Sequence, residues 1–224
     1  GNTDCYQPIE RKLKITREIL KICLKYRHPV GIITKNALVL RDLDILKELN
    51  KWNLVRVNIT VTTLDEKLRI ALEPRTASCK MRLKAVEQLS KEGIPVNVMM
   101  APVIPGLNSH EIFPLLKTVA ELGAKSAHYT MIRLNGNIGE VFEDWIKKAF
   151  PDKANKVIQQ IKECHNGKLS DNRFKTRMRG DGKIAESISK TFSLAKKRFF
   201  SQKATFHVNT ESFLRGNDKQ LSLF

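Results

Sequence analysis

Residues 54–62 read Leu-Val-Arg-Val-Asn-Ile-Thr-Val-Thr, and this stretch decides the fold. Polar and β-branched apolar residues alternate along it with a period of two, which is typical of a half-buried β-strand. The apolar positions are Val57, Ile59 and Val61, and the polar positions are Asn58, Thr60 and Thr62. One face of the strand is therefore predicted to be polar. In a parallel barrel that face should be the inner one, near the mouth.

Three further apolar runs are predicted strands, and they lie at residues 30–33, 94–100 and 127–132. Apolar residues recur at helical spacing before and between the strands, which predicts helices over residues 8–26, 43–49, 83–92 and 109–122. Asp42 and Ser109 are the predicted N-caps of two of these helices. Helices and strands alternate, so the sequence predicts an α/β fold with a parallel sheet, closed or partly closed into a barrel.

Polar groups follow several of the predicted strands at the point where the apolar run stops. These groups are Thr34-Lys35, Thr60, Thr62 and the run Ala101-Pro-Val-Ile-Pro-Gly-Leu-Asn108. Because the carboxyl ends of parallel strands meet at one edge of the sheet, these groups should converge on one mouth. The sequence therefore predicts an enzyme pocket there.

The pattern changes after Leu134, where strands give way to apolar residues at helical spacing in residues 141–146, 157–161 and 184–199. We therefore expect three parts: a partial barrel over residues 1–134, a basic helical extension over 135–200, and a loose tail over 201–224.

The composition indicates a folded, strongly basic protein. Its 224 residues are 42% hydrophobic and carry a net charge of +17, much of it after Lys147. A surface with that charge attracts nucleic acid, although solvated helix faces in a lysine-rich organism would give the same composition. No window is long and apolar enough for a membrane span and no signal peptide opens the chain, so the expected location is the cytoplasm.

The four cysteines, Cys5, Cys23, Cys79 and Cys164, are far apart and form no CxxC pair. We interpret them as reduced thiols that mostly serve packing. The opening Gly1-Asn-Thr-Asp4 turn is typical of a strand-to-helix loop, yet no strand precedes it. We therefore expect a truncated or trimmed chain.

Six stretches taken in order resemble one family: residues 1–10, 33–36, 59–65, 73–75, 101–108 and 177–180. They are similar to the radical S-adenosylmethionine (radical SAM) proteins called DNA repair photolyases, relatives of spore photoproduct lyase. The resemblance implies a partial (βα)6 barrel, a [4Fe-4S] cluster held by a CxxxCxxC loop, S-adenosylmethionine as cofactor, lyase-like chemistry and a reductant for the cluster. That loop is absent from these residues, so the cluster ligands are expected only in the full-length form. This chain alone should be inactive.

The resemblance also implies a cofactor site at the predicted mouth. Asn2, Thr3 and Asp4 match the loop that receives the methionyl amine, although a plain turn would look the same. Lys35 would pair with the methionyl carboxylate, and its alternative is a surface lysine. Thr60 and Thr62 suit the ribose and amino-acid parts of the cofactor, but threonine is also an ordinary strand residue.

Val103, Ile104 and Gly106 match the turn that contacts adenine, and the alternative is a tight strand-to-helix turn. Glu73 and Arg75 either reach the pocket or pair with each other. No role is carried over to Cys5, and we assign no catalytic residue and no metal ligand.

A basic cluster in the extension is the candidate nucleic-acid site. Its cations are Arg173, Lys175, Arg177 and Arg179, and they alternate with Phe174 and Met178. Such a cluster suits a DNA backbone, while simple solvation is the rival interpretation, and Arg133 at the last strand end is a further candidate phosphate contact. Two functions stay open: a radical SAM enzyme acting on DNA photolesions or another nucleic acid, and a non-catalytic nucleic-acid-binding module on a barrel scaffold. The sequence leaves the oligomeric state open.

Overall fold

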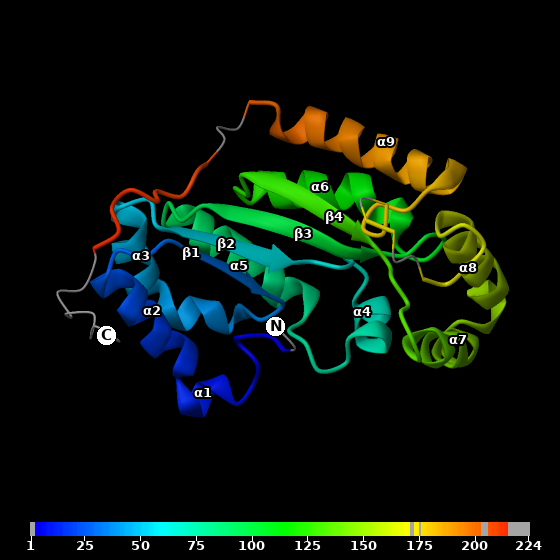
Figure 1. The fold of residues 1–224 in the computed structure, drawn as a ribbon, viewed down its shortest axis with the longest axis horizontal. Coiled ribbons are helices and arrows are strands. Elements are labelled where there is room, and N and C mark those ends of the chain that lie inside the picture. Colours follow the sequence, from blue (N-terminus) through cyan, green and yellow to red (C-terminus); the bar gives the residue numbers. More distant parts are fainter. Residues whose placement is uncertain (1–2, 171–172, 175, 203–205, 215–224) are drawn as a thin grey trace, which may run out of the picture.

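A single four-stranded parallel sheet organises the molecule (Figure 1). The computed structural model describes residues 3–170, 173–174, 176–202 and 206–214. The strands follow one another in the order β1 (Val30–Thr34), β2 (Val55–Thr60), β3 (Val96–Val103) and β4 (Ser126–Met131). All neighbouring pairs are parallel, which confirms the predicted α/β fold.

The pairing register brings the carboxyl ends of the strands to one edge of the sheet. Thr34 lies opposite Ile59, Thr60 lies opposite Met99, and Val103 lies opposite Met131. The last pair follows an irregularity in the pairing between Met100 and Val103. The predicted convergence of the strand ends is therefore present.

Helices precede the first strand, fill the connections between strands and follow the last one. Their bounds are α1 Glu10–Leu13, α2 Ile15–Lys25, η1 Ala37–Asp42, α3 Leu43–Lys51, α4 Glu66–Leu72, α5 Cys79–Lys91, η2 Ser109–Glu111, α6 Ile112–Glu121, α7 Ile138–Ala149, α8 Pro151–Cys164 and α9 Gly182–Phe200. None of the helices in the described part of the chain is long and apolar enough to cross a membrane.

The two faces of the sheet have different environments. Helices α3, α5 and α6 pack against one face, where Val57, Ile59 and Val61 are fully buried in the main core (Figure 1). The other face is partly open, since Gly31 is exposed and the side chain of Ile33 is 57% exposed. Asn58, Thr60 and Thr62 belong to this second face because strand residues alternate in direction. The predicted division of residues 54–62 into an apolar and a polar face is confirmed.

The C-terminal helices pack at two places on this sheet. Helices α7 and α8 form a second apolar cluster beyond the carboxyl ends of the strands, with Ile104 and Leu107 among its members. Helix α9 packs along α6 and β4, where the ring of Phe192 lies 4.7 Å from that of Tyr129. The predicted C-terminal helices are confirmed, while the division into three parts at residues 134 and 200 stays a prediction.

Residues 206–214 cross the amino-terminal end of the sheet. The backbone N–H of Asn209 donates to the carbonyl oxygen of Asn53 at 2.8 Å, and that of Leu214 donates to the carbonyl oxygen of Tyr26 at 2.9 Å. Phe213 makes an edge contact with His28 at 5.7 Å between ring centroids. This part of the predicted tail is therefore fastened to the loops that follow α2 and α3.

Several local predictions were wrong. The helix predicted over residues 8–26 is two helices, because Lys14 adopts a left-handed φ of 54° between α1 and α2. Asp42 makes no cap hydrogen bond and is a buried ion-pair partner instead. Ser109 begins the short η2 helix, and its hydroxyl accepts from the N–H of Gly106 at 3.3 Å. Helix α4 was not predicted.

Candidate functional site

Asp4 joins the N-terminal loop to the end of β1. Its Oδ1 accepts hydrogen bonds from the Thr34 hydroxyl at 2.7 Å and from the N–H of Tyr6 at 2.8 Å. Its Oδ2 accepts from the N–H of Lys35 at 2.7 Å. Three donors from the protein therefore hold this carboxylate at the mouth of the sheet, beside the side chain of Lys35.

Glu73 is the centre of the polar network at the strand ends. The Lys35 ammonium forms an ion pair with Glu73 Oε1, and the Thr62 hydroxyl donates to the same oxygen at 2.9 Å. The Thr62 hydroxyl also lies 3.3 Å from the carbonyl oxygen of Ala101 at the end of β3. The loop after α4 thus reaches back and links the carboxyl ends of three strands.

Arg82 on α5 is the third charged side chain of this network. Its Nη2 donates to Glu73 Oε2 at 2.6 Å, and its Nη1 donates to the carbonyl oxygen of Thr60 at 3.1 Å. Its Nε donates to the carbonyl oxygen of Ala77 at 2.9 Å, and Nη2 also contacts the Thr76 hydroxyl. The Arg82 side chain is only 2% exposed, so its charge depends on Glu73.

The importance of Arg82 was missed from the sequence, although a signal for it is present. Arg82 lies within the buried stripe of α5, three residues after Cys79 and three, four and seven residues before Ala85, Val86 and Leu89. An arginine in line with the apolar positions of a helix needs a buried partner. The sequence allows two roles for Glu73: it reaches the pocket, or it pairs with Arg75. The structure shows that the Glu73 side chain reaches the strand ends.

The exposed fractions of the Lys35, Glu73 and Arg82 side chains determine which of their charges a ligand can reach. Burial would raise the pKa of the Glu73 carboxyl, but Lys35 and Arg82 together hold that pKa below its ordinary value. Glu73 is therefore ionised near neutral pH. Its side chain is 8% exposed, whereas that of Lys35 is 34% exposed. The Lys35 ammonium is thus the most accessible charge of this network, and it suits an anionic group such as a carboxylate.

The turn after β3 is fixed by Asn108. Its side-chain Oδ1 accepts from the N–H of Ile104 at 2.6 Å, and its Nδ2 donates to the carbonyl oxygens of Thr62 and Pro102 at 2.9 and 3.0 Å. Val103 and Ile104 are fully buried in the two core clusters. Of the three residues predicted to contact adenine, only Gly106 is exposed.

Gly106 has a left-handed backbone conformation and lies close to a side chain of α8. Its φ is +73°, and a Cβ built at this position would lie 2.5 Å from Oε1 of Gln160. Both observations exclude a larger residue without rearrangement. The Gln160 side chain approaches Gly106 closely in the structure, and the approach of a ligand to this glycine stays a prediction.

The basic cluster lies beside the carboxyl end of β4. The carbonyl oxygen of Met178 accepts from the N–H of Met131 at 2.9 Å, and the Met178 sulfur lies 3.5 Å from Nη1 of Arg133. Phe174 is 79% exposed, and the Arg177 guanidinium lies 5.8 Å from the centre of its ring. An exposed aromatic ring and arginines thus sit at the same end of the sheet as Lys35.

The other members of the basic cluster differ in their surroundings. Arg173 lies 3.4 Å from a carboxylate oxygen of Asp181, and Arg179 is exposed. Lys175 and Asn2 lie outside the described residues, and Thr3 is exposed. Among the predicted site residues, the structure brings together Asp4, Lys35, Thr62 and the backbone of Thr60.

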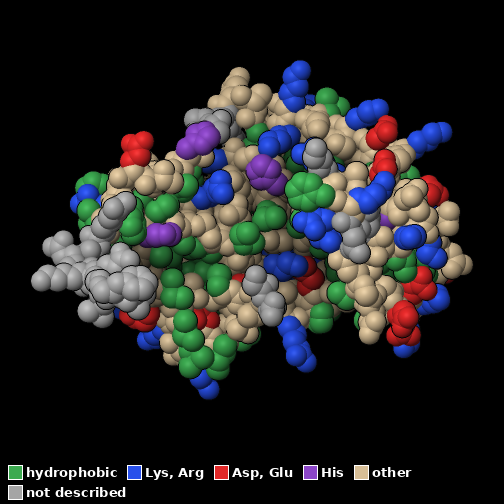
Figure 2. Space-filling view, in the orientation of Figure 1, with side chains coloured by type: hydrophobic (Ala, Val, Ile, Leu, Met, Phe, Trp, Pro, Cys, Tyr) green, Lys and Arg blue, Asp and Glu red, His purple; other side chains and the backbone are tan. Residues whose placement is uncertain are grey.

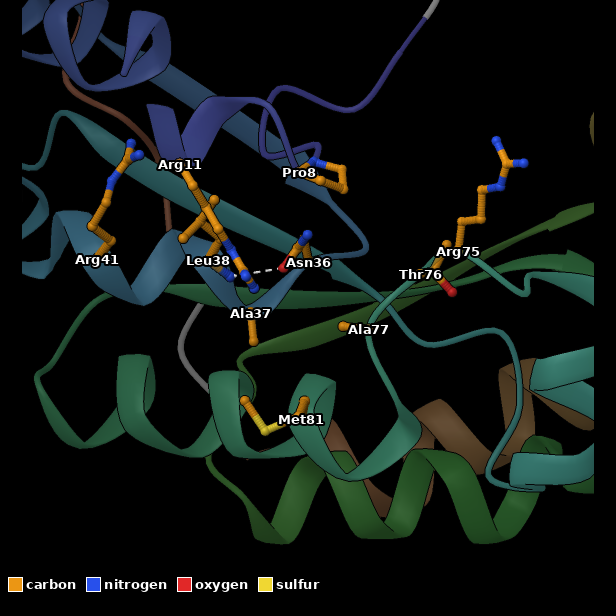
Figure 3. A pocket seen from close by; sticks show the side chains of 10 residues that line it. All are labelled: Pro8, Arg11, Asn36, Ala37, Leu38, Arg41, Arg75, Thr76, Ala77 and Met81. Carbon is orange, nitrogen blue, oxygen red and sulfur yellow. Dashed lines mark hydrogen bonds between the residues drawn. The ribbon is translucent and has the colours of Figure 1, made fainter. Parts of the chain in front are cut away.

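A cavity of about 460 Å³ lies next to this network, on the side of α1 and η1 (Figure 3). Arg11 points into it toward Asn36, whereas Arg75 points away from it (Figure 3). The lining residues are Pro8, Arg11, Asn36, Ala37, Leu38, Arg41, Arg75, Thr76, Ala77 and Met81. Within the described residues Arg75 forms no ion pair with Glu73, which excludes that alternative.

The described cysteines do not fit an iron–sulfur cluster. No group of three or more His, Cys, Asp or Glu side chains that could hold a metal ion occurs among the residues that the structure describes. Burial raises the pKa of Cys5 and Cys164 to about 11 and that of Cys79 to about 12. A cluster needs several thiolates within one loop, and these thiols are separate and protonated.

The fold and the site together define a class of protein: a parallel α/β protein whose polar groups gather at the carboxyl ends of its strands. A sequence model of the Radical SAM superfamily matches residues 1–119, more than half of the chain. The protein therefore belongs to the radical SAM superfamily.

The chain is also similar to curated proteins that carry no functional name. "Uncharacterized protein MJ0683" of Methanocaldococcus jannaschii is 31% identical over 150 residues, which are 67% of this chain and 54% of that protein. "Uncharacterized protein Rv2578c" of Mycobacterium tuberculosis is 28% identical over 153 residues, 67% of this chain and 45% of that protein. The chain thus spans about half the length of these relatives.

Two similar solved structures are mutants of spore photoproduct lyase. They are similar in fold, with TM-scores of 0.59 and 0.57 at 16% sequence identity. Each covers 86% of this chain, and the chain covers 55% and 56% of them. At this identity the likeness concerns the fold alone.

Proposed function

We propose that this protein acts as an iron–sulfur-dependent radical SAM enzyme on nucleic acid, with photolesions in DNA as the first substrate class to test. Membership of the radical SAM superfamily supports the cofactor, whose bound form would supply a carbon radical after reductive cleavage of its sulfonium. The described residues contribute the strand-end site and the basic cluster. Because they bring no three cysteines together, we expect this chain alone to be inactive.

The donor set at the strand ends suits the amino-acid part of S-adenosylmethionine. Lys35 would pair with its carboxylate, and the carboxylates of Asp4 and Glu73 offer acceptors for its amine. Thr62 and Thr60 remain predicted contacts of the ribose, although both are buried, and the exposed Gly106 is the part of the turn after β3 that would meet the adenine edge. Asn2 and Thr3 remain predicted contacts of the methionyl amine.

A single observation carries the choice of nucleic acid as substrate. The hydrogen bond between Met131 and Met178 places the basic cluster at the end of the sheet where the cofactor would react. Phe174 is exposed beside Arg177, and base stacking on an aromatic ring together with phosphate pairing is a common way to hold a nucleic-acid strand.

The basic cluster can be tested by DNA binding at several salt concentrations. The double variant Arg177→Ala/Arg179→Ala should lower the slope of log K against log salt by about two, because each arginine is expected to neutralise one phosphate. Phe174→Ala should weaken binding about tenfold with the slope unchanged. The matched control is Lys153→Ala/Lys156→Ala, which removes the same charge from the exposed surface of α8. Equal losses of affinity in both double variants would show that only overall charge matters.

The cofactor site can be tested separately. Titration with S-adenosylmethionine should show weaker binding for Lys35→Ala/Thr62→Ala than for the unaltered chain. In the full-length protein, anaerobic reconstitution with iron and sulfide should yield 5′-deoxyadenosine. If neither binding nor release occurs, the enzyme proposal is wrong.

The second candidate is a non-catalytic nucleic-acid-binding module, which the net charge of +17 favours. It predicts salt-dependent DNA binding that Lys35→Ala/Thr62→Ala leaves unchanged and no binding of S-adenosylmethionine. The two titrations above therefore separate the candidates.

A further inference from the structure

A second polar cavity, of about 520 Å³, lies at the opposite end of the sheet from Lys35 and Glu73. Arg56 and Asn97 line it from the second positions of β2 and β3, and Lys125 lines it from the position before β4. Lys196 and Lys197 line it from the last turn of α9. The cavity therefore forms where the amino-terminal ends of three strands meet the end of a helix.

In the part of the chain that the structure describes, the cavity is lined by several cations and by no carboxylate. Among the described residues, Arg56, Lys125, Lys196 and Lys197 form no ion pair, whereas Lys190 on the same α9 helix lies near Glu186. Figure 2 shows basic and histidine side chains gathered on this open face, below the C-terminal end of α9. Like charges held this close repel one another unless an anion joins them.

Two observations inside the cavity favour an anionic ligand. The Nε of Arg56 is buried and has no hydrogen-bond partner, although a buried guanidinium nitrogen normally donates. His128, which also lines the cavity, has its pKa lowered first by burial and then by Lys196 and Arg56. The positive charges of Lys196 and Arg56 are thus close enough to His128 to disfavour its protonated form.

We propose that this cavity binds a phosphate group, carried either by a free nucleotide or by a nucleic-acid strand. An arginine and several ammonium groups around one space match the several oxygens of a phosphate better than a single carboxylate. The rings of His128 and Phe206 line the same cavity and offer surfaces on which a base can stack. This proposal does not depend on the radical SAM chemistry at the other end of the sheet.

Calorimetric titration of the chain with pyrophosphate at low salt tests the site. Lys196→Ala/Lys197→Ala and Arg56→Gln should each raise the Kd about tenfold, because each removes charged donors to the anion. Arg56→Lys should recover part of the affinity, since it retains the charge. The matched control is Lys183→Ala/Lys190→Ala, which removes two charges from α9 outside the cavity and should leave the Kd within about twofold.

Thermal unfolding of each variant shows whether it is folded, and only folded variants are compared. The absence of pyrophosphate binding, or an equal loss of affinity in the α9 control, would overturn the proposal. A mononucleotide that binds more tightly than pyrophosphate would identify the source as a nucleotide. Affinity that rises further with oligonucleotide length would identify a strand.

One further variant separates this proposal from the proposed function. Arg177→Ala/Arg179→Ala lies at the other end of the sheet and should leave pyrophosphate binding unchanged. If it abolishes pyrophosphate binding, the anion binds at the basic cluster and the cavity is not the site. If DNA binding fails entirely while pyrophosphate binding persists, the proposed function is wrong and the phosphate site stands.

Discussion

Removal of the Glu73 carboxylate should destabilise the protein strongly. Glu73→Ala leaves the Arg82 guanidinium, only 2% exposed, without its carboxylate, and it releases Lys35 and Thr62 from the ends of their strands. Breaking a buried ion pair by removing one partner costs about 3–5 kcal/mol. Because Lys35 is partly exposed, we expect the lower part of that range, about 3 kcal/mol. In a chain of this size that corresponds to a fall in Tm of roughly 6–12 °C.

The assay is thermal and urea unfolding of Glu73→Ala beside Glu87→Ala. Glu87 pairs with Lys91 on the exposed surface of α5, so its loss should cost no more than about 0.5 kcal/mol. The double variant Glu73→Ala/Arg82→Met removes both buried charges and should be more stable than Glu73→Ala alone. If Glu73→Ala costs no more than Glu87→Ala, the reasoning about this network is refuted.

The same network predicts a dependence on pH. The pKa of Glu73 in the folded state lies below the ordinary value of 4.5, so the folded state binds fewer protons at this site than the unfolded state. The stability that ionised Glu73 contributes is therefore complete above pH 4.5 and is lost as the pH falls through the folded pKa. The difference in stability between the unaltered chain and Glu73→Gln should shrink over that acidic range.

Three other predictions concern single side chains. Gly106→Ala should cost about 1–2 kcal/mol in urea unfolding, and Gln160→Ala in the same chain should recover only the part due to steric overlap, because the positive φ remains. Tyr6→Phe should cost about 1 kcal/mol, since the buried Tyr6 hydroxyl donates to Asp42 at 3.1 Å, and a neutral result would exclude a contribution from that bond. Alkylation of Cys5, whose pKa burial and nearby acids raise to about 11, should be slow near neutral pH and rise about tenfold per pH unit, which mass spectrometry can follow.

The sheet could be predicted because its strands show their alternation directly. Val57, Ile59 and Val61 face the helices, and the threonines between them face the other side, as the period of two requires. The strand ends could be predicted for the same reason, since parallel strands must finish at one edge. Composition and the spacing of apolar residues were therefore enough to predict each strand or helix that lies in one environment along its whole length.

The interactions within the site could not be predicted in the same way. Glu73 and Arg82 meet Lys35 only because a loop after α4 folds back over the strand ends, and no local pattern specifies the path of that loop. Lys14 likewise breaks a continuous helical pattern through a left-handed conformation that its residue type does not favour. Tertiary interactions outweighed local preference at these positions.

The hydrogen bond between Leu214 and Tyr26 has a consequence for synthesis on the ribosome. Residue 26 is synthesised long before residues 206–214, yet its carbonyl oxygen obtains this partner only when that later stretch has been made. Contacts between such distant positions slow folding, and domains usually assemble as the chain grows. The loop after α2 should therefore stay open to solvent, proteases and chaperones until residues 206–214 have been synthesised and have docked against it.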